Sequence, residues 1–344
     1  MKDFPWFKHY PEGVAQEINL YDFDSLIDLF EVSCKKYATR VAFENMGKTL
    51  TFQELDTLTQ DFAAFLQEGL GLQKGERIAI QMPNLLQFPI AFFGALRAGL
   101  IVVNTNPLYT PREMEHQFKD ADISAIVIVA NFASHLEKVM LNMSIKHVIV
   151  TELGDMLGGF KGSLVNFVVK HIKKMVPTYH LPLAHPFKSA LKKGASLHYT
   201  KPTITNEDVA VLQYTGGTTG VSKGAQLSHG NIVAHNSMIT EWFKPYMNSN
   251  GNDLIITAIP MYHIFALTVN GILMFSTGVK NVLITNPRDM KGFVKELKKQ
   301  HFTIFTGVRL RAAHEFNSPT NSICPERQVR EEFFKTAWNC CVTE

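Results

Sequence analysis

The chain has 344 residues, of which 46% are hydrophobic, and a formal net charge of +3. A chain of this size can bury a large core, and we expect two or three lobes instead of one. A membrane-spanning protein is excluded, because the most apolar runs, 88–103 and 264–275, are interrupted or shorter than the roughly 18 to 20 residues required. Only Cys34 precedes residue 324, and the first residues do not resemble a signal peptide, so we expect a reducing cytosol and no disulfide framework.

The first 150 residues alternate predicted helices with predicted strands. Apolar residues recur with the helical period over 25–37, 52–69, 88–98 and 111–120. Short apolar runs predict strands at 41–44, 49–51, 77–81, 100–103, 125–129 and 147–150. This alternation is typical of doubly wound α/β proteins.

The segment 156–206 is strongly basic. It has eight lysines, from Lys161 to Lys201, and no Asp or Glu, so it carries +8 and leaves −5 for the rest of the chain. We predict an amphipathic helix that ends at Pro177, with Val165, Val168, Ile172, Met175 and Val176 on one face and Asn166, Lys170, Lys173 and Lys174 on the other.

Two interpretations of this helix stay open. Its lysines suit contact with an anionic bilayer, and they equally suit a solvated face of a helix that packs on its own domain. Nucleic acid is the least favoured partner, because the segment contains no recognisable nucleic-acid-binding module.

Residues 214–224, YTGGTTGVSKG, form a loop of glycines and hydroxyl residues that ends in one cation. The glycines can adopt positive φ and turn backbone N–H groups inward, the hydroxyl residues add donors, and Lys223 adds a positive charge. The loop lies between a predicted buried strand, 209–214, and a turn at 227–231 that leads into a helix up to about Trp242. It therefore predicts a site for a nucleoside triphosphate.

The loop differs from the common nucleotide motifs. It is not G-x-G-x-x-G, and it is not Walker A, because Ser222 stands where that motif has glycine before its lysine. A P-loop kinase or GTPase is therefore disfavoured. The remaining alternative is a glycine-rich surface turn, which does not account for so many hydroxyl groups between a strand and a helix.

His263 follows a second apolar strand, 254–259, within the run PMYH at 260–263. Taken alone, such a histidine is more often a hydrogen-bonded core residue than a functional one. The phosphate loop upstream favours the functional interpretation.

The string TGGTTGxxKG resembles the phosphate loop of the adenylate-forming enzymes, which include acyl-CoA synthetases, luciferases and peptide-synthetase adenylation domains. PMYH is similar to the P-[LM]-[FY]-H segment of the same superfamily. The stretches 6–14 and 99–113 resemble bacterial long-chain fatty acyl-CoA synthetases. The resemblance implies an incomplete N-terminal α/β domain of an adenylate-forming enzyme, with parallel or mixed sheets flanked by helices.

The same resemblance implies a two-step reaction. We expect a cytoplasmic location, and contact with the membrane through Lys161–Lys201 is one of the two interpretations left open above. A long-chain fatty acid carboxylate attacks the α-phosphorus of ATP in the presence of Mg²⁺, and coenzyme A then displaces AMP from the acyl-adenylate. The residues implied to bind the ATP phosphates are Thr215, Gly216, Gly217, Thr218, Thr219, Gly220 and Lys223. Tyr262 and His263 would face the acyl-adenylate, and Lys223 and His263 would be catalytic. The sequence assigns no metal ligand and no oligomeric state.

The sequence changes character at Val308. Before it, a strand, a helix and a strand are predicted at 281–285, 288–300 and 302–306, so we place a partial AMP-binding domain at 1–308, with the basic insert at 156–206. Residues 309–344 show no amphipathic period and contain three of the four cysteines. A shifted reading frame or a disordered tail would produce this composition, and a divergent tail is the alternative.

The chain lacks later segments of the family, namely Y-G-x-T-E, T-G-D and the C-terminal domain with its lysine. A second functional hypothesis therefore stands beside the ligase: a catalytically inactive, truncated remnant that at most binds ATP phosphates.

Overall fold

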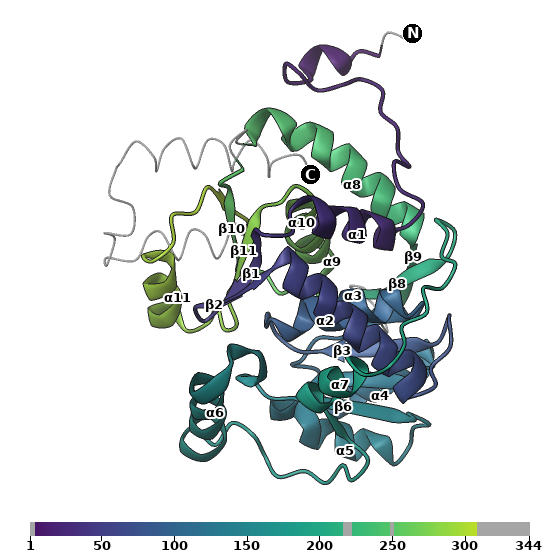
Figure 1. Cartoon of the computed structure of the whole chain (residues 1–344), viewed down its shortest axis with the longest axis vertical. Helices are drawn as coiled ribbons and strands as arrows, with labels where there is room; N and C mark the ends of the chain where they lie inside the picture. The colour runs from purple at the N-terminus through teal and green to yellow at the C-terminus, as the bar shows by residue number, and fades with distance from the viewer. Residues whose placement is uncertain (1–3, 216–221, 248–250, 308–344) are drawn as a thin grey trace.

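Two β-sheets with helices on their faces make up the protein in a computed structural model that describes residues 4–215, 222–247 and 251–307 (Figure 1). The strands are β1 (Val41–Asn45), β2 (Lys48–Thr51), β3 (Arg77–Gln81), β4 (Ile101–Asn104), β5 (Ala125–Val129), β6 (His147–Thr151), β7 (His185–Pro186), β8 (Val209–Thr215), β9 (Lys223–Ser228), β10 (Leu254–Thr257), β11 (Lys280–Leu283) and β12 (Ile304–Phe305). The helices are α1 (Leu26–Lys36), α2 (Phe52–Ala64), α3 (Gln87–Arg97), α4 (Pro111–Ala121), α5 (Ala133–Met140), α6 (Gly159–Phe167), α7 (Phe187–Gly194), α8 (His229–Phe243), α9 (Ile264–Ala266), α10 (Met274–Ser276) and α11 (Met290–Leu297). Turns of π-helix, which are wider than α-helical turns, extend α2 (Phe65–Gly69) and α6 (Val168–Ile172) and join α9 to α10 (Leu267–Leu273).

Both sheets are mainly parallel. The larger has the order β7-β6-β5-β3-β4-β8-β9, in which only β9 runs antiparallel to its neighbour. The smaller has the order β12-β10-β11-β1-β2, in which only β2 is antiparallel. The predicted fold class, α/β with parallel or mixed sheets flanked by helices, is confirmed.

Local sequence signals fix where several helices begin. The Thr51 hydroxyl accepts the N–H of Glu54, whose carboxylate accepts the N–H of Thr51, and Thr110 and Glu113 repeat this capping box at α4. Strand β5 consists only of buried residues, as expected for a parallel strand covered on both faces.

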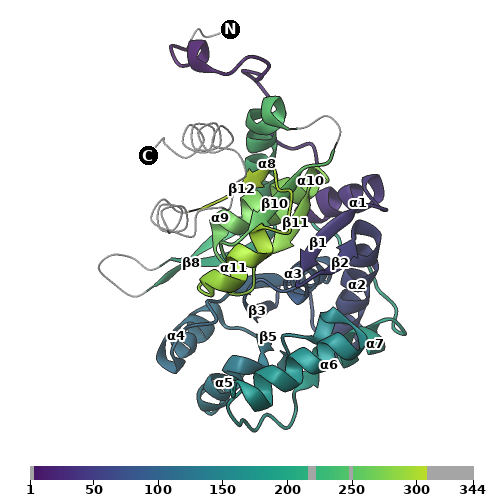
Figure 2. The ribbon, with the colours of Figure 1, turned by 90° about the vertical axis from the view of Figure 1, so that its left-hand side faces the viewer.

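Helix α3 lies between the two sheets, and all eleven of its residues are buried (Figure 2). The largest core cluster draws side chains from both sheets. Phe275 of α10 packs against four other rings of this cluster: its ring centroid lies 4.6 to 6.0 Å from those of Phe30, Phe43, Phe52 and Phe93. Full burial of one such ring contributes about 1.5 to 3 kcal/mol, so this cluster binds the two sheets into one packed body.

Arg97, at the end of α3, is a buried cation whose two terminal nitrogens are hydrogen-bonded, whereas its Nε has no partner among the described residues. Its guanidinium contacts Asp56 of α2 at 2.7 Å and Glu31 of α1 at 3.1 Å. Burial opposes its charge, but Asp56 and Glu31 more than offset this effect and raise the pKa of Arg97. Lys201 joins the group through Glu31 at 2.7 Å and Asp28 at 3.1 Å.

The basic helix ends earlier than predicted. The N–H of Lys173 donates to the carbonyl of Val168, five residues back, in the wider turn that follows α6. Lys174 then takes a φ of +50°, which no helix accommodates. The helix therefore ends at Ile172, before Pro177 can terminate it.

The buried side of this helix also differs from the predicted one. Gly162 is buried, and the Asn166 amide oxygen accepts the N–H of Gly154 at 2.6 Å. Ile172 and Met175, which belong to the predicted apolar face, are 65% and 49% exposed. The close approach to Gly154 explains the difference, because only small or hydrogen-bonding side chains fit there.

Some other predictions need correction. Strand β9 was not predicted, because its residues were assigned to the phosphate loop and the following turn. Helix α11 is shorter than the predicted 288–300, since Asp289 caps it, and β12 covers only two residues of the predicted 302–306. The predicted tail, 309–344, lies outside the described residues, so the division at 308 stays a prediction.

Candidate functional site

The predicted phosphate loop connects β8 and β9 at one edge of the larger sheet. The two strands pair antiparallel, with Thr215 opposite Lys223, so both residues lie at the loop end of the hairpin. Because β8 runs parallel to β4, this end is the carboxyl edge of the sheet, where open α/β sheets bind ligands. Both side chains are exposed. The residues between them, Gly216–Gly220 with Thr218 and Thr219, lie outside the described residues.

Helix α4 contacts the loop end of this hairpin at two points. The Tyr214 hydroxyl donates to Asp120 at 2.5 Å, and the Nε2 of His116 lies 3.1 Å from the carbonyl oxygen of Ser222. Because a carbonyl only accepts, this Nε2 carries the hydrogen. Burial, and then Asp120, raise the pKa of the Tyr214 phenol, so the hydroxyl keeps the proton that it donates.

Gly224 lies opposite Tyr214 across the hairpin and leaves room for its ring. A Cβ atom at position 224 would lie 2.8 Å from a carbon of that ring, closer than real contacts allow. The glycine after the lysine is therefore required by packing against Tyr214, independently of any ligand.

The PMYH segment follows β10 and is fixed by Asn84. The amide nitrogen of Asn84 donates to the carbonyls of Thr257 and Ile259 at 2.9 and 3.0 Å, and its oxygen accepts the N–H of Met261 at 2.8 Å. One buried side chain thus sets the path of the backbone from the end of the strand to Tyr262.

Gln213 joins this segment to the hairpin. Its amide nitrogen donates to the carbonyl of Tyr262 at 3.2 Å, and its amide oxygen accepts from Asn104 of β4 at 3.2 Å. Gln213 is buried on β8, two residues before Thr215. The two sequence motifs, about fifty residues apart in the chain, therefore meet at the same sheet edge through one hydrogen bond.

His263 is exposed and caps a short helix. Its Nδ1 accepts the N–H of Phe265 at 3.4 Å, at the start of α9. The alternative of a buried core histidine is therefore wrong. With Nδ1 occupied, Nε2 is the ring nitrogen that is directed to the surroundings.

The sequence prediction missed Gln213 and Asn84. The signal for Gln213 was a single amide in the otherwise apolar strand 209–214, and Asn84 stood directly after a proline at the end of β3. Both are buried polar residues, which require partners, and here the partners are backbone groups of the site.

Within the described ranges, no three His, Cys, Asp or Glu side chains come together in a way that would hold a metal ion. The same part of the chain contains no helix long and apolar enough to cross a bilayer.

Comparison with known proteins assigns the family. The family model of the AMP-binding enzymes matches residues 30–319. The chain belongs to the AMP-binding family. The Long-chain-fatty-acid--CoA ligase of Escherichia coli O157:H7 is 55% identical over 303 residues, which are 88% of this chain and 54% of that protein. The ligase of the same name from Bacillus subtilis is 34% identical over 306 residues, 88% of this chain and 53% of its own length. The chain thus spans about half the length of the curated relatives it matches.

Solved structures show the same AMP-binding fold. A long-chain-fatty-acid-CoA ligase from Archaeoglobus fulgidus superimposes with a TM-score of 0.71 at 20% identity, over 91% of this chain and 57% of that one. An anthranilate CoA ligase in complex with anthranoyl-AMP gives 0.73 at 18% identity, over 89% of this chain and 54% of the other. At these identities the likeness concerns the fold alone.

Proposed function

We propose that the chain serves the ATP-dependent activation of long-chain fatty acids. In the first step the fatty carboxylate attacks the α-phosphorus of ATP, the bond to pyrophosphate breaks, and acyl-adenylate forms. In the second, the thiol of coenzyme A displaces AMP. The observation that carries the proposal is the hydrogen bond between Gln213 and the Tyr262 carbonyl, because it holds the two motifs of the family at one sheet edge.

Lys223, Thr215 and the loop Gly216–Gly220 are proposed to hold the β and γ phosphates. Lys223 is exposed at the hairpin opening and makes no ion pair with the described residues, so its charge is available for a phosphate. Negative charge grows on pyrophosphate as it leaves, and fixed donors there lower the barrier. Loss of one such donor typically costs about 3 to 4 kcal/mol in the transition state. Mg²⁺, when bound, would neutralise phosphate charge and would bind mainly through phosphate oxygens.

Tyr262 and His263 are proposed to face the acyl-adenylate. Their backbone is fixed from two directions, by Asn84 and by Gln213. Because the Nδ1 of His263 accepts a backbone N–H, we assign its Nε2 to the contact with the acyl-adenylate. Such double fixation limits the motion of the histidine relative to the hairpin.

The test is pyrophosphate release, or trapping of acyl-hydroxamate, with the purified chain, palmitate, ATP and Mg²⁺. Turnover that Lys223→Ala abolishes supports the ligase. Pyrophosphate binding without turnover, in a chain that melts cooperatively, supports the second hypothesis of a remnant that binds phosphates only. A folded chain that binds neither ATP nor pyrophosphate contradicts the ligase and the proposed phosphate site.

We also propose a cytoplasmic location with peripheral contact to an anionic membrane through the basic segment, Lys161–Lys201. The eight lysines of this segment and its lack of acidic residues support this proposal. Lys201 is an exception within it, because its charge is paired with Asp28 and Glu31.

A further inference from the structure

Helix α6 and the wider turn after it carry a row of apolar side chains that faces solvent. The exposed fractions are 83% for Phe160, 48% for Leu164, 54% for Phe167 and 65% for Ile172. Positions 160, 164 and 167 share one side of an α-helix. The wider turn advances each residue by a smaller angle, which brings Ile172 close to the same side.

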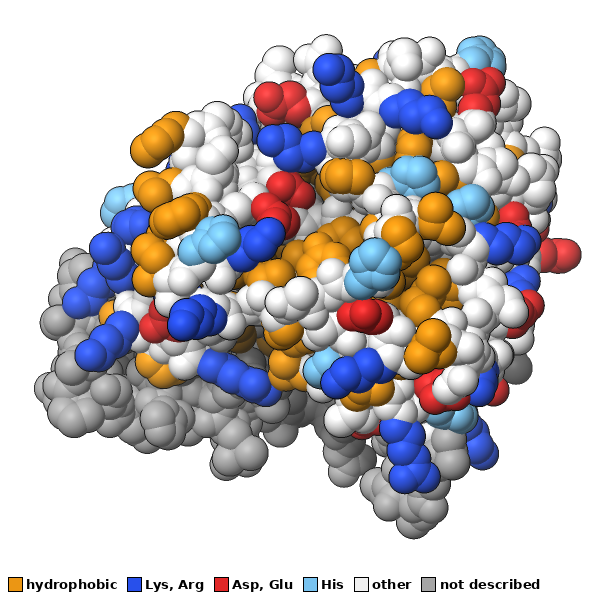
Figure 3. Space-filling model, turned by 90° about the horizontal axis from the view of Figure 1, so that it is seen from below, with side chains coloured by type: hydrophobic (Ala, Val, Ile, Leu, Met, Phe, Trp, Pro, Cys, Tyr) orange, Lys and Arg blue, Asp and Glu red, His pale blue; other side chains and the backbone are white. Residues whose placement is uncertain are grey.

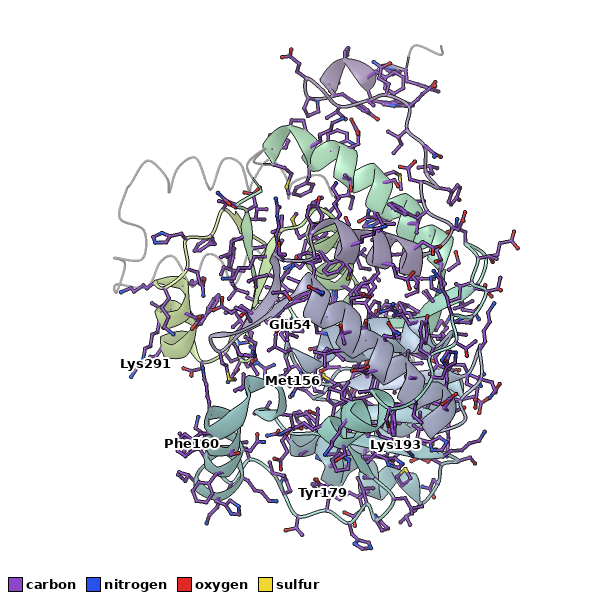
Figure 4. All side chains as sticks on the ribbon, in the orientation of Figure 1. Glu54, Met156, Phe160, Tyr179, Lys193 and Lys291 are labelled. Atoms are coloured by element: carbon purple, nitrogen blue, oxygen red, sulfur yellow. The ribbon has the colours of Figure 1, made fainter. Side chains whose placement is uncertain are left out.

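This row lies at the outer margin of the molecule. Figure 4 places Phe160 on α6, away from the two sheets, and shows Met156 closer to the body of the protein. The opposite side of α6 contacts the protein through Gly162 and Asn166, as described above. Helix α6 therefore packs on the protein through its other side, and its contact with the core does not require the exposed apolar row.

Unpaired cations accompany the row. Lys170, Lys173 and Lys174 are exposed and form no ion pair with the residues that the structure describes. Lys161, by contrast, donates to the Met46 carbonyl in the turn between β1 and β2. Figure 3 shows the molecule from below, with hydrophobic and basic side chains side by side on its projecting left-hand part. The segment 156–206 thus combines exposed apolar groups with lysines and contains no acidic residue.

We propose that the apolar row of α6, Phe160, Leu164, Phe167 and Ile172, inserts into the interface of an anionic bilayer, flanked by the exposed Lys170, Lys173 and Lys174. This deepens the membrane contact proposed above by assigning it to one face, and it does not depend on the ATP chemistry. Apolar rings would enter the boundary between headgroups and acyl chains, while the lysines contact lipid phosphates. A second copy of the chain is disfavoured as the occupant, because symmetric pairing of this face would bring its lysines together.

The charge arm of the test uses vesicles of phosphatidylcholine alone and of phosphatidylcholine with one quarter phosphatidylglycerol. We expect the chain to sediment with the anionic vesicles only, and less so at high salt. Each cation near such a surface contributes about fivefold to partitioning, so K170E/K173E/K174E should weaken binding by about 100-fold or more. The matched control is K291E/K295E/K298E, which makes the same charge change on the exposed side of α11 and should lose far less.

The apolar arm replaces rings of the row by a small polar residue. F160S/F167S should weaken binding to anionic vesicles by about tenfold or more. Its control is V32S/L141S, which removes two exposed apolar side chains elsewhere, at 49% and 88% exposure. Because all of these positions are exposed, every variant should melt within a few degrees of the parent chain, which verifies folding.

Three results would overturn the proposal. These are equal binding to neutral and anionic vesicles, equal losses in the α6 and control variants, or a dimer in light scattering that F160S/F167S converts to a monomer. The vesicle assay contains no nucleotide or fatty acid, so its failure would leave the proposed phosphate site untested and intact.

Discussion

At the scale of single residues, Lys223 is the side chain on which the phosphate site depends most. Lys223→Ala should weaken pyrophosphate or ATP binding by about 1.5 to 3 kcal/mol, because a charge-assisted hydrogen bond is lost. Stability should hardly change, since the side chain is exposed. Titration calorimetry measures the affinity, and Gln226→Ala on the same strand is the control. Unchanged affinity in the lysine variant would exclude the proposed role.

Gly224 offers a test of packing that needs no ligand. Gly224→Ala should destabilise the chain by about 1 to 3 kcal/mol, because its Cβ would meet the Tyr214 ring, which Asp120 holds in place. Urea unfolding measures the change. In a Tyr214→Ala background the cost should largely disappear, and an undiminished cost there would show that the ring is not its cause.

His229 makes stability depend on pH. Burial lowers its pKa from 6.5 to about 4, and its Nδ1 accepts the N–H of Leu26 at the start of α1. Between these values the unfolded chain binds a proton that the folded chain does not, so stability falls as the pH drops from about 6.5 towards 4. The loss is about 3 kcal/mol. Unfolding at several pH values should show a flatter profile for His229→Gln than for the parent, whereas the exposed His198→Gln should match the parent.

At the scale of elements, the hydrogen bond of Gln213 couples β8 to the PMYH segment. Gln213→Met keeps the volume but leaves the Tyr262 carbonyl and the Asn104 amide without this partner, which costs about 1 to 3 kcal/mol. If the bond also positions the site, acyl-adenylate formation should fall while the affinity for pyrophosphate alone stays. A parallel fall of both would mean that the hairpin itself had been disturbed.

Most elements could be predicted from the sequence because local signals determine them. The capping boxes at Thr51 and Thr110 fixed the starts of α2 and α4, and the all-apolar run of β5 fixed a buried strand. The face of α6 could not be predicted, because it depends on contact with Gly154, a tertiary partner. Strand β9 was missed because its polar residues become a strand only by pairing with β8.

The candidate site could be predicted as two separate motifs but not as one place. Nothing local in the sequence indicates that the carbonyl of Tyr262 lies against β8, since the contact depends on how the two sheets pack. Buried amides such as Gln213 and Asn84 are the residues through which that packing acts, and their partners are known only from the fold.

At the scale of the whole molecule, Arg97 ties three helices together. Arg97→Ala should destabilise the chain by about 3 kcal/mol, at the lower end for a buried pair because Asp56 and Glu31 can partly reach water. Arg97→Lys should recover part of this, as it keeps the charge but not the forked geometry. Thermal or urea unfolding checks both variants, and an alanine variant as stable as the parent would contradict this account.

Lys201 and Lys161 fix the orientation of the basic segment relative to the rest of the protein. They lie near the two ends of the basic segment, and each is bonded to a different part of the protein, Lys201 to α1 and Lys161 to the turn after β1. A segment held at both ends cannot swing as a tether. If the apolar row of α6 rests on a lipid surface, every molecule therefore has the same orientation relative to the bilayer. The loop end of the β8–β9 hairpin then lies at a constant distance from the lipid from which its substrate would come.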